Sequence, residues 1–122
     1  EAIRVLLHSI EHSQLIRMLS YQDWDQYEYE YGYTALQWCA DNKRNELMKF
    51  ILDSASDKEC YQLLSITNCL PWAPLHISCN AGDAESVRVM LNHINQDMRY
   101  SLLQMTTDYG NNPLQIVIAV MS

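Results

Sequence analysis

The sequence contains only three glycines, and they form no glycine-rich loop of the kind that binds phosphate groups. Basic residues are also scarce, because eight Lys and Arg stand against fifteen Asp and Glu and give a net charge of −7. Nucleic acids and anionic lipid headgroups are bound largely through Lys and Arg, so this balance argues against both as ligands. A basic segment of a partner protein fits the charge better.

The chain also lacks any apolar run long enough to cross a bilayer, and no signal-peptide pattern stands at its beginning. We therefore expect a cytoplasmic protein without direct membrane insertion, and the first residue, Glu1, indicates a piece of a longer chain. The four cysteines form no CxxC pair and have no histidine at zinc-finger spacing, so we expect no metal site, and nothing else calls for a cofactor. They are interpreted as reduced, partly buried thiols: Cys39, Cys60, Cys69 and Cys79.

What the sequence does contain is a repeat with a step of 39 residues. The same three-residue pattern begins at residues 35, 74 and 113, as Ala35-Leu36-Gln37, Pro74-Leu75-His76 and Pro113-Leu114-Gln115. The step also carries Ile51-Leu52 onto Met90-Leu91. A register that holds over so many positions of matching chemistry indicates a tandem-repeat architecture.

Upstream of this register the offset becomes 45, since Ile3 corresponds to Met48 and Met18-Leu19 corresponds to Leu63-Leu64. The longer offset predicts an insertion of six residues between positions 19 and 32, where acidic residues alternate with aromatic ones. We expect a single domain with these parts: the back half of one repeat (1–19), an inserted acidic and aromatic finger (20–31), two full repeats (32–70 and 71–109) and the front helix of a further repeat (110–122).

Each repeat is predicted to begin with a helix. Thr34 and Asn112 are residue types that cap helix N-termini, and prolines follow Ala73 and Asn112 at the first helical position, where a missing N–H costs nothing. The resulting helices cover 35–42 and 74–81, and a glycine at position 82 ends the second of them.

Two further helices are predicted in each unit. Apolar residues at i, i+3 and i+4 indicate second helices that begin near Asn45 and Asp83. Ser56-Asp57-Lys58-Glu59 is a capping box, and Asn95 is its equivalent one unit later. The Tyr-x-Leu-Leu pattern after each of them predicts a short third helix that packs into the stack.

These motifs resemble the ankyrin repeat, whose first-helix signature is Gly-x-Thr-Pro-Leu-His-x-Ala-Ala. The signature is matched by residues 32–40 (GYTALQWCA), 73–79 (APLHISC) and 110–115 (GNNPLQ). The second-helix pattern of the family is matched by residues 45–52 (NELMKFIL) and 84–91 (AESVRVML). The resemblance covers nearly the whole chain, and it implies an all-α solenoid of stacked helix-turn-helix units joined by finger loops.

The units depart from the usual ankyrin repeat in several respects. Their step of 39 residues exceeds the usual period of about 33, consistent with an extra short helix in each unit. The signature histidine occurs only as His76, with Gln37 at the same position one unit earlier. Pro71 replaces a finger glycine, and Lys43 stands where Gly82 stands later. The resemblance implies that His76 is a structural residue that hydrogen-bonds the backbone between fingers.

The resemblance also implies a noncatalytic module that binds a partner protein through the fingers and the exposed side of the first helices. Trp72, Tyr33 and Asn111 occupy equivalent fingertip positions, and Trp and Tyr are enriched in interface hot spots. Two interpretations of Trp72 stay open, namely contact with a partner or folding back onto the neighbouring finger. The insertion either recognises a basic segment through its rings and carboxylates or covers the stack with its tyrosines. The candidate partner-binding residues are Trp24, Tyr27, Tyr29, Glu30, Tyr31, Tyr33, Asp41, Asn42, Leu70, Trp72, Asn80, Asp108, Tyr109 and Asn111.

Two alternatives to partner binding follow from other features. One is a structural spacer or self-association segment of a larger scaffold or channel cytosolic domain, since the C-terminal helix leaves apolar residues such as Ile116 and Ile118 uncovered. The other is a zinc hydrolase that would use His8, Glu11 and His12, because these match an H-x-x-E-H motif. That chemistry needs one continuous helix, and the register predicts a helix break between the two histidines. We therefore expect no catalytic residue.

Overall fold

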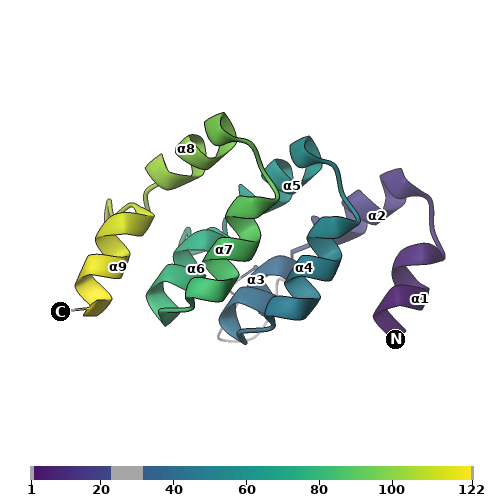
Figure 1. Cartoon of the computed structure of the whole chain (residues 1–122), viewed down its shortest axis with the longest axis horizontal. Helices are drawn as coiled ribbons and strands as arrows, with labels where there is room; N and C mark the ends of the chain where they lie inside the picture. Colours follow the sequence, from purple (N-terminus) through teal and green to yellow (C-terminus); the bar gives the residue numbers. More distant parts are fainter. Residues whose placement is uncertain (1, 23–31, 122) are drawn as a thin grey trace.

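The computed structural model describes residues 2–22 and 32–121, and all regular secondary structure in this part of the chain is helical (Figure 1). The all-α class expected from the sequence is confirmed. None of the described helices combines the length and the apolar character that crossing a bilayer requires. The described helices are α1 (Ala2–His8), α2 (His12–Leu19), α3 (Ala35–Asp41), α4 (Asn45–Asp53), α5 (Asp57–Leu64), α6 (Pro74–Ala81), α7 (Ala84–Asn92), α8 (Gln96–Gln104) and α9 (Pro113–Met121).

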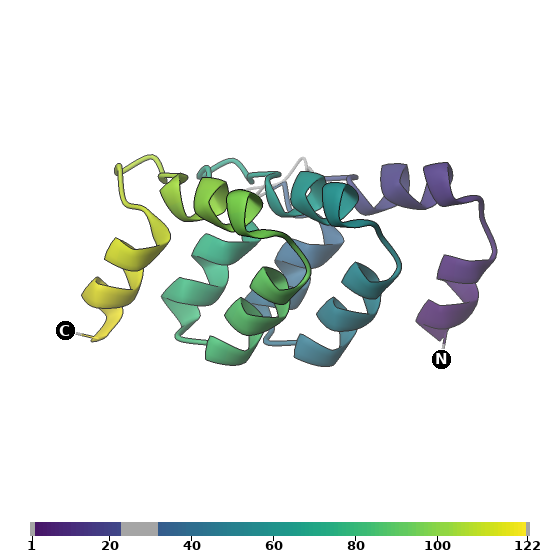
Figure 2. The same cartoon turned by 45° about the horizontal axis from the view of Figure 1, so that its top comes forward.

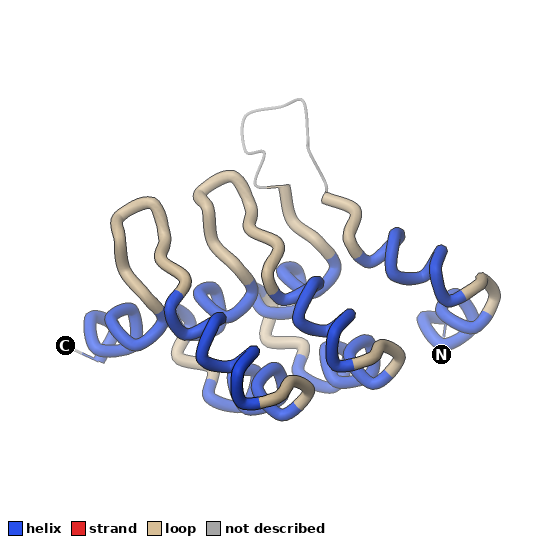
Figure 3. The backbone as a smooth tube through the Cα atoms, turned by 90° about the horizontal axis from the view of Figure 1, so that it is seen from above, coloured by secondary structure: helices blue, strands red, loops and turns tan. Residues whose placement is uncertain are grey.

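The helices recur in groups of three that lie side by side along the molecule (Figure 1). Helices α3, α4 and α5 form one unit and α6, α7 and α8 the next, and equivalent helices are neighbours: α3 packs against α6, α6 against α9, and α4 against α7. Helices α2, α5 and α8 run along the top of the stack in the first two views (Figure 2). The loops 65–73 and 105–112, which we call fingers, project to the same side of the stack (Figure 3).

Reciprocal hydrogen bonds begin several of these helices. At α3, the Gln37 N–H donates to the Thr34 hydroxyl (3.3 Å) and the Thr34 N–H donates to the Gln37 side chain (2.9 Å). Helix α9 begins in the same way with Asn112 and Gln115, at 2.9 and 2.8 Å. Helix α6 has Ala73 at its N-cap and therefore no capping side chain, but a proline at its first position has the backbone angle that a helix needs.

A residue with a left-handed backbone follows the end of the first helix in each complete unit. Helix α6 ends at Ala81, as predicted, and Gly82 follows it with a φ of 68°. Helix α3 ends at Asp41, one residue before its predicted end, and the positive φ lies at Lys43, with a value of 56°. Positions 43 and 82 are one repeat step apart. The turn geometry is thus kept in a unit where a residue with a side chain must adopt it, at a cost of about 1–2 kcal/mol.

The core is a continuous row of apolar side chains between the helices. Leu36 and Leu75 take equivalent places in successive units, as do Leu63 and Leu102, and each of these side chains is at most 1% exposed. Burial of a side chain of this size contributes about 1.5–3 kcal/mol, so each unit is stabilised by its neighbours in the stack. The other large core residues with almost no exposure are Met48, Ile51, Leu52, Leu64 and Met90.

Candidate functional site

Each described finger is closed by a backbone hydrogen bond at the same position. The Asn68 N–H donates to the Trp72 carbonyl (2.9 Å), and the Thr107 N–H donates to the Asn111 carbonyl (3.0 Å) one repeat step later. In the first of these fingers, the side-chain oxygen of Asn68 also accepts the N–H groups of Leu70 and Trp72, at 2.9 and 2.8 Å. These bonds fix where the side chains of Leu70 and Trp72 leave the backbone.

A second set of hydrogen bonds joins each unit to the next finger. Gln37 donates from its side-chain amide to the Ile66 carbonyl (2.7 Å). One step later, His76 accepts the Ala73 N–H at Nδ1 (3.0 Å), so the ring proton lies on Nε2 and is donated to the Met105 carbonyl (2.9 Å). Burial lowers the pKa of His76, and the bond to Met105 opposes this shift only in part. The prediction that His76 bonds the backbone between fingers is confirmed.

A recess of about 270 Å³ lies where α3, the 65–73 finger and α6 meet, and we call it the first recess. Its walls combine side chains from the end of α3, from the finger and from one face of α6. Five of its lining residues are among those proposed from the sequence, and the other three were not in that set. The full lining is Tyr33, Asp41, Asn68, Leu70, Trp72, Ile77, Asn80 and Ala81.

A second recess, of about 360 Å³, lies one unit further along the stack. Each of its eight lining residues follows a lining residue of the first recess by the 39-residue step. Trp72 and Asn80 line both recesses and form the wall that they share. The lining of the second recess is Trp72, Asn80, Thr107, Tyr109, Asn111, Ile116, Ala119 and Val120.

The two recesses have equivalent positions but different chemistry. The first contains the exposed carboxylate of Asp41 and the rings of Tyr33 and Trp72, a combination that suits a cationic side chain. The second has no charged lining residue, and its wall on α9 includes the apolar side chain of Val120. Tyr109 stands at its edge and is 84% exposed. The second recess therefore suits an apolar side chain.

The aromatic residues at the fingertip positions are partly buried. The Trp72 ring packs against the core and lies edge-on to the His76 ring, with 6.2 Å between their centroids. The Tyr33 ring lies edge-on to the Trp38 ring at 5.0 Å. Trp72 thus folds back onto the stack while part of its surface lines both recesses. Of the two interpretations that the sequence left open, the structure shows that Trp72 folds back, here onto the His76 ring of α6, while contact with a partner stays a prediction.

The remaining candidate residues lie apart from the recesses or outside the described ranges. Asn42 caps the end of α3, where its amide donates to the Trp38 carbonyl (2.8 Å), and it lines a different hollow beside Ile3 of α1. Asp108 is exposed in the 105–112 finger and lines neither recess. The candidates from the insertion lie outside the described residues: Trp24, Tyr27, Tyr29, Glu30 and Tyr31.

Sequence reasoning omitted several residues of the recesses from the candidate set. Asn68 and Thr107 are buried polar residues at equivalent finger positions, and Ile77 and Ile116 are equivalent apolar residues of α6 and α9. The repeat step predicts that the members of each pair are equivalent. It does not predict that they border an open recess, because the recess depends on how each finger folds back over the neighbouring helix.

Gln22, which is also absent from the candidate set, connects the start of the insertion to the residue that follows it and to the next finger. Its side-chain amide donates to the Gly32 carbonyl (2.9 Å) and to the Thr67 carbonyl (2.8 Å). Gly32 directly follows the undescribed residues 23–31, and Thr67 belongs to the 65–73 finger. One side chain therefore fixes both the entry and the exit of the insertion relative to the next finger.

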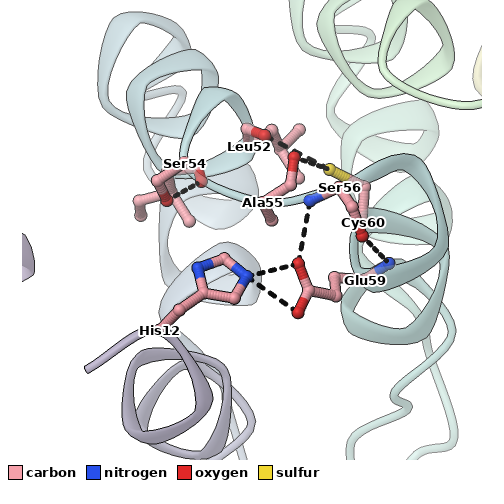
Figure 4. Close-up of polar contacts among 8 residues, drawn as sticks. His12, Leu52, Ser54, Ala55, Ser56, Glu59 and Cys60 are labelled. Atoms are coloured by element: carbon pink, nitrogen blue, oxygen red, sulfur yellow. Dashed lines mark hydrogen bonds and ion pairs between the residues drawn. The ribbon is translucent and has the colours of Figure 1, made fainter.

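The H-x-x-E-H segment does not lie on one helix. Helix α1 ends at His8, and α2 begins at His12 with Glu11 as its N-cap, so the predicted helix break is confirmed. His12 instead pairs with Glu59 of α5, whose carboxylate oxygens lie 2.7 and 2.9 Å from Nε2 (Figure 4). The Ser56 N–H donates to the same carboxylate, and this bond and that from His12 hold the pKa of Glu59 below its ordinary value.

The four cysteines are free, and three of them are buried. Burial raises the pKa of Cys39, Cys60 and Cys79 to about 11 in each case. The Cys60 thiol donates to the Leu52 carbonyl at 3.3 Å (Figure 4). Thiols with such a pKa are protonated at neutral pH and are poor nucleophiles. Within the described ranges, no group of three or more His, Cys, Asp and Glu side chains is placed to hold a metal ion.

Comparison with known proteins gives a likeness in structure alone. No family model matches the sequence, and no curated protein matches it. The fold is similar to that of a chain in the crystal structure of the yeast ribosomal protein Rps3 in complex with its chaperone Yar1, with a TM-score of 0.68 and 14% sequence identity. The match covers 97% of this chain and 73% of that chain. Identity this low shows a shared fold and says nothing of function.

Proposed function

We propose that this chain is an ankyrin-repeat module of the cytoplasm that binds a partner protein without catalysis. The observation that carries the proposal is the pair of equivalent recesses between the fingers and the first helices, which share Trp72 and Asn80. Repeat proteins use extended concave surfaces for binding, and a surface that repeats along the stack can contact several residues of one ligand. The ankyrin assignment itself is supported by the signature residues and by the repeating helix order.

The chemistry of this face supports a protein ligand. Both recesses are open hollows lined mainly by aromatic, amide and apolar groups, and aromatic residues are enriched in the cores of protein interfaces. The net charge of −7 and the carboxylate of Asp41 favour a partner segment that is basic. The structurally similar chain comes from a complex between two proteins, which is consistent with this proposal and does not identify the partner.

A second candidate function is self-association through α9. Leu114, Ile118 and Met121 on this helix are 64%, 57% and 81% exposed, and an exposed apolar patch marks an interaction site. The expectation that Ile116 is uncovered as well is wrong, because its side chain packs into the core and is 5% exposed. Light scattering separates the two functions. A dimer that dissociates on the Ile118→Glu substitution would favour self-association, whereas a monomer that binds peptides supports the partner-binding function.

The experiment that tests partner binding uses two exposed tyrosines. Tyr109 borders the second recess, and Tyr100 is 65% exposed on α8, outside both recesses. Peptides are selected from a random display library against the chain and then titrated against the Tyr109→Ala and Tyr100→Ala variants by fluorescence anisotropy. We expect Tyr109→Ala to weaken binding by about tenfold, the effect of losing an interface hot spot, while Tyr100→Ala has little effect. Equal effects of both substitutions would contradict the proposed face.

A further inference from the structure

The spacing of the two recesses restricts the shape of a ligand that fills both of them. The recesses are formed by equivalent residues of adjacent units, so their separation equals the distance between packed neighbouring helices, about 8–10 Å. In a β-strand, side chains on one face are about 7 or 13 Å apart, and neither distance falls within the separation of the two recesses. A polyproline II helix has three residues per turn and rises about 9 Å per turn, so side chains at i and i+3 point the same way at the required distance.

The shared wall argues against an α-helical ligand. Residues i and i+7 of an α-helix are also about 10 Å apart, but residues i+3 and i+4 lie between them on the same face. Those side chains would meet Trp72 and Asn80, which separate the recesses. In a polyproline II segment, residues i+1 and i+2 point away from the surface instead. Its backbone has no internal hydrogen bonds, and the exposed amide of Asn80 on the wall can both donate to it and accept from it.

The chemistry of the recesses assigns a side chain to each. Asp41, Tyr33 and Trp72 give the first recess a carboxylate and two rings, which suit the flat guanidinium of an arginine. The second recess has no charged lining residue, and Ile116 and Val120 favour an aliphatic side chain there. The difference between the recesses gives a sequence requirement as well as a shape.

We propose that the face binds a polyproline II segment with an arginine in the first recess and an aliphatic residue, three positions away, in the second. This proposal rests on the proposed partner-binding function and adds the conformation, spacing and residue types of the ligand. A general affinity of an acidic surface for basic peptides would not depend on the distance between the arginine and the aliphatic residue. The dependence of affinity on this spacing therefore tests the proposal.

The test uses fluorescein-labelled proline-rich peptides and measures anisotropy. Two peptides carry Arg and Leu three positions apart in either chain direction, within the cores Arg-Pro-Pro-Leu and Leu-Pro-Pro-Arg. Control peptides place Arg and Leu two or four positions apart in the same proline host, and another replaces Arg by Gln. We expect one of the two directions to bind about tenfold more tightly than every control, the effect of gaining one recess contact.

Matched variants of the chain assign the two contacts. Asp41→Asn is expected to weaken the Arg peptide and leave the Gln peptide unchanged, while Asp97→Asn, at an exposed acid of α8 outside both recesses, changes neither. Val120→Asp is expected to weaken both peptides, because it places a carboxylate in the apolar recess. Circular dichroism melting curves check that each variant is folded.

The outcomes separate this proposal from the function on which it rests. Affinity that does not depend on the spacing of Arg and Leu, or tighter binding by a helical peptide with the two residues seven apart, overturns the polyproline II proposal. Partner binding survives that result if library-selected peptides still lose affinity with Tyr109→Ala. If substitutions in the recesses change the affinity of neither the library-selected peptides nor the proline-rich peptides, both proposals are wrong.

Discussion

At three equivalent positions, the two complete units of the stack reach the same local geometry with different residues. Gln37 in the first unit and His76 in the second both donate to a backbone carbonyl of the next finger, at 2.7 and 2.9 Å. Lys43 and Gly82 both adopt a left-handed backbone. Thr34 caps its helix with a hydroxyl, whereas the other unit relies on a proline one residue after the cap. The fold therefore requires a bond or a backbone angle at each of these positions, and not a particular residue.

The largest loss of stability is expected from the substitution of His76 by alanine, and the substitution by glutamine serves as its comparison. His76→Ala leaves the Ala73 N–H and the Met105 carbonyl without their partner, at about 1–3 kcal/mol for each buried group left unpaired. His76→Gln recreates the arrangement of Gln37 and is expected to lose much less stability. Equilibrium urea unfolding followed by circular dichroism measures both losses. Equal losses in the two variants would mean that ring packing against Trp72, and not hydrogen bonding, fixes this position.

A smaller effect is expected from exchanging the residues at the two helix stops. Lys43→Gly should raise the free energy of unfolding and Gly82→Lys should lower it, each by about 1 kcal/mol, because only glycine adopts this backbone without strain. A Cβ atom added at Gly82 meets no atom within 4 Å, so the loss there comes from the backbone alone. Melting temperatures of the two variants measure the changes. Gly82→Asn serves as the control, since asparagine tolerates the left-handed region better than lysine.

The smallest expected effect is a difference in pH dependence between the two units. His76 has a pKa below its ordinary value of 6.5 in the folded chain, so the unfolded chain takes up this proton at a higher pH. The stability that His76 contributes is complete above pH 6.5 and decreases as the pH falls below it. The His76→Gln variant lacks this loss, while His12 and His93 are the same in both proteins. Urea unfolding from about pH 8 to about pH 5 should show wild type losing stability relative to the variant. A constant difference across this range would contradict the role given to burial.

The fold could be predicted where local chemistry and the repeat step agree. Pro74 marks the start of α6 because proline is tolerated only at the first turn of a helix, and the helix occupies the predicted residues 74–81. The break between His8 and His12 was predicted by transferring the helix end near Asp53 back by the upstream offset of 45 residues. The first prediction rests on a short stretch of chain, where the sequence determines the local conformation strongly, and the second rests on the register between repeats.

The recesses could be predicted only in part. Tyr33, Trp72 and Asn111 were proposed because the repeat step places them at equivalent fingertips. The degree of burial of Trp72 could not be read from the step, because it depends on the contact with the His76 ring. Asn68 is a residue type that bonds the backbone N–H two residues later, as it does at Leu70, but its place in the wall of the recess depends on how the finger folds back over the neighbouring helix.

The bonds between units have a consequence for how such a stack can change in evolution. Their acceptors are the main-chain carbonyls of Ile66 and Met105, and every residue type supplies a carbonyl. The donor of one unit therefore places no requirement on the side chains of the finger that it meets. A unit can be duplicated, deleted or exchanged with another without a compensating substitution at this joint. Variation can then accumulate in the exposed residues of each unit while the connection between units stays the same.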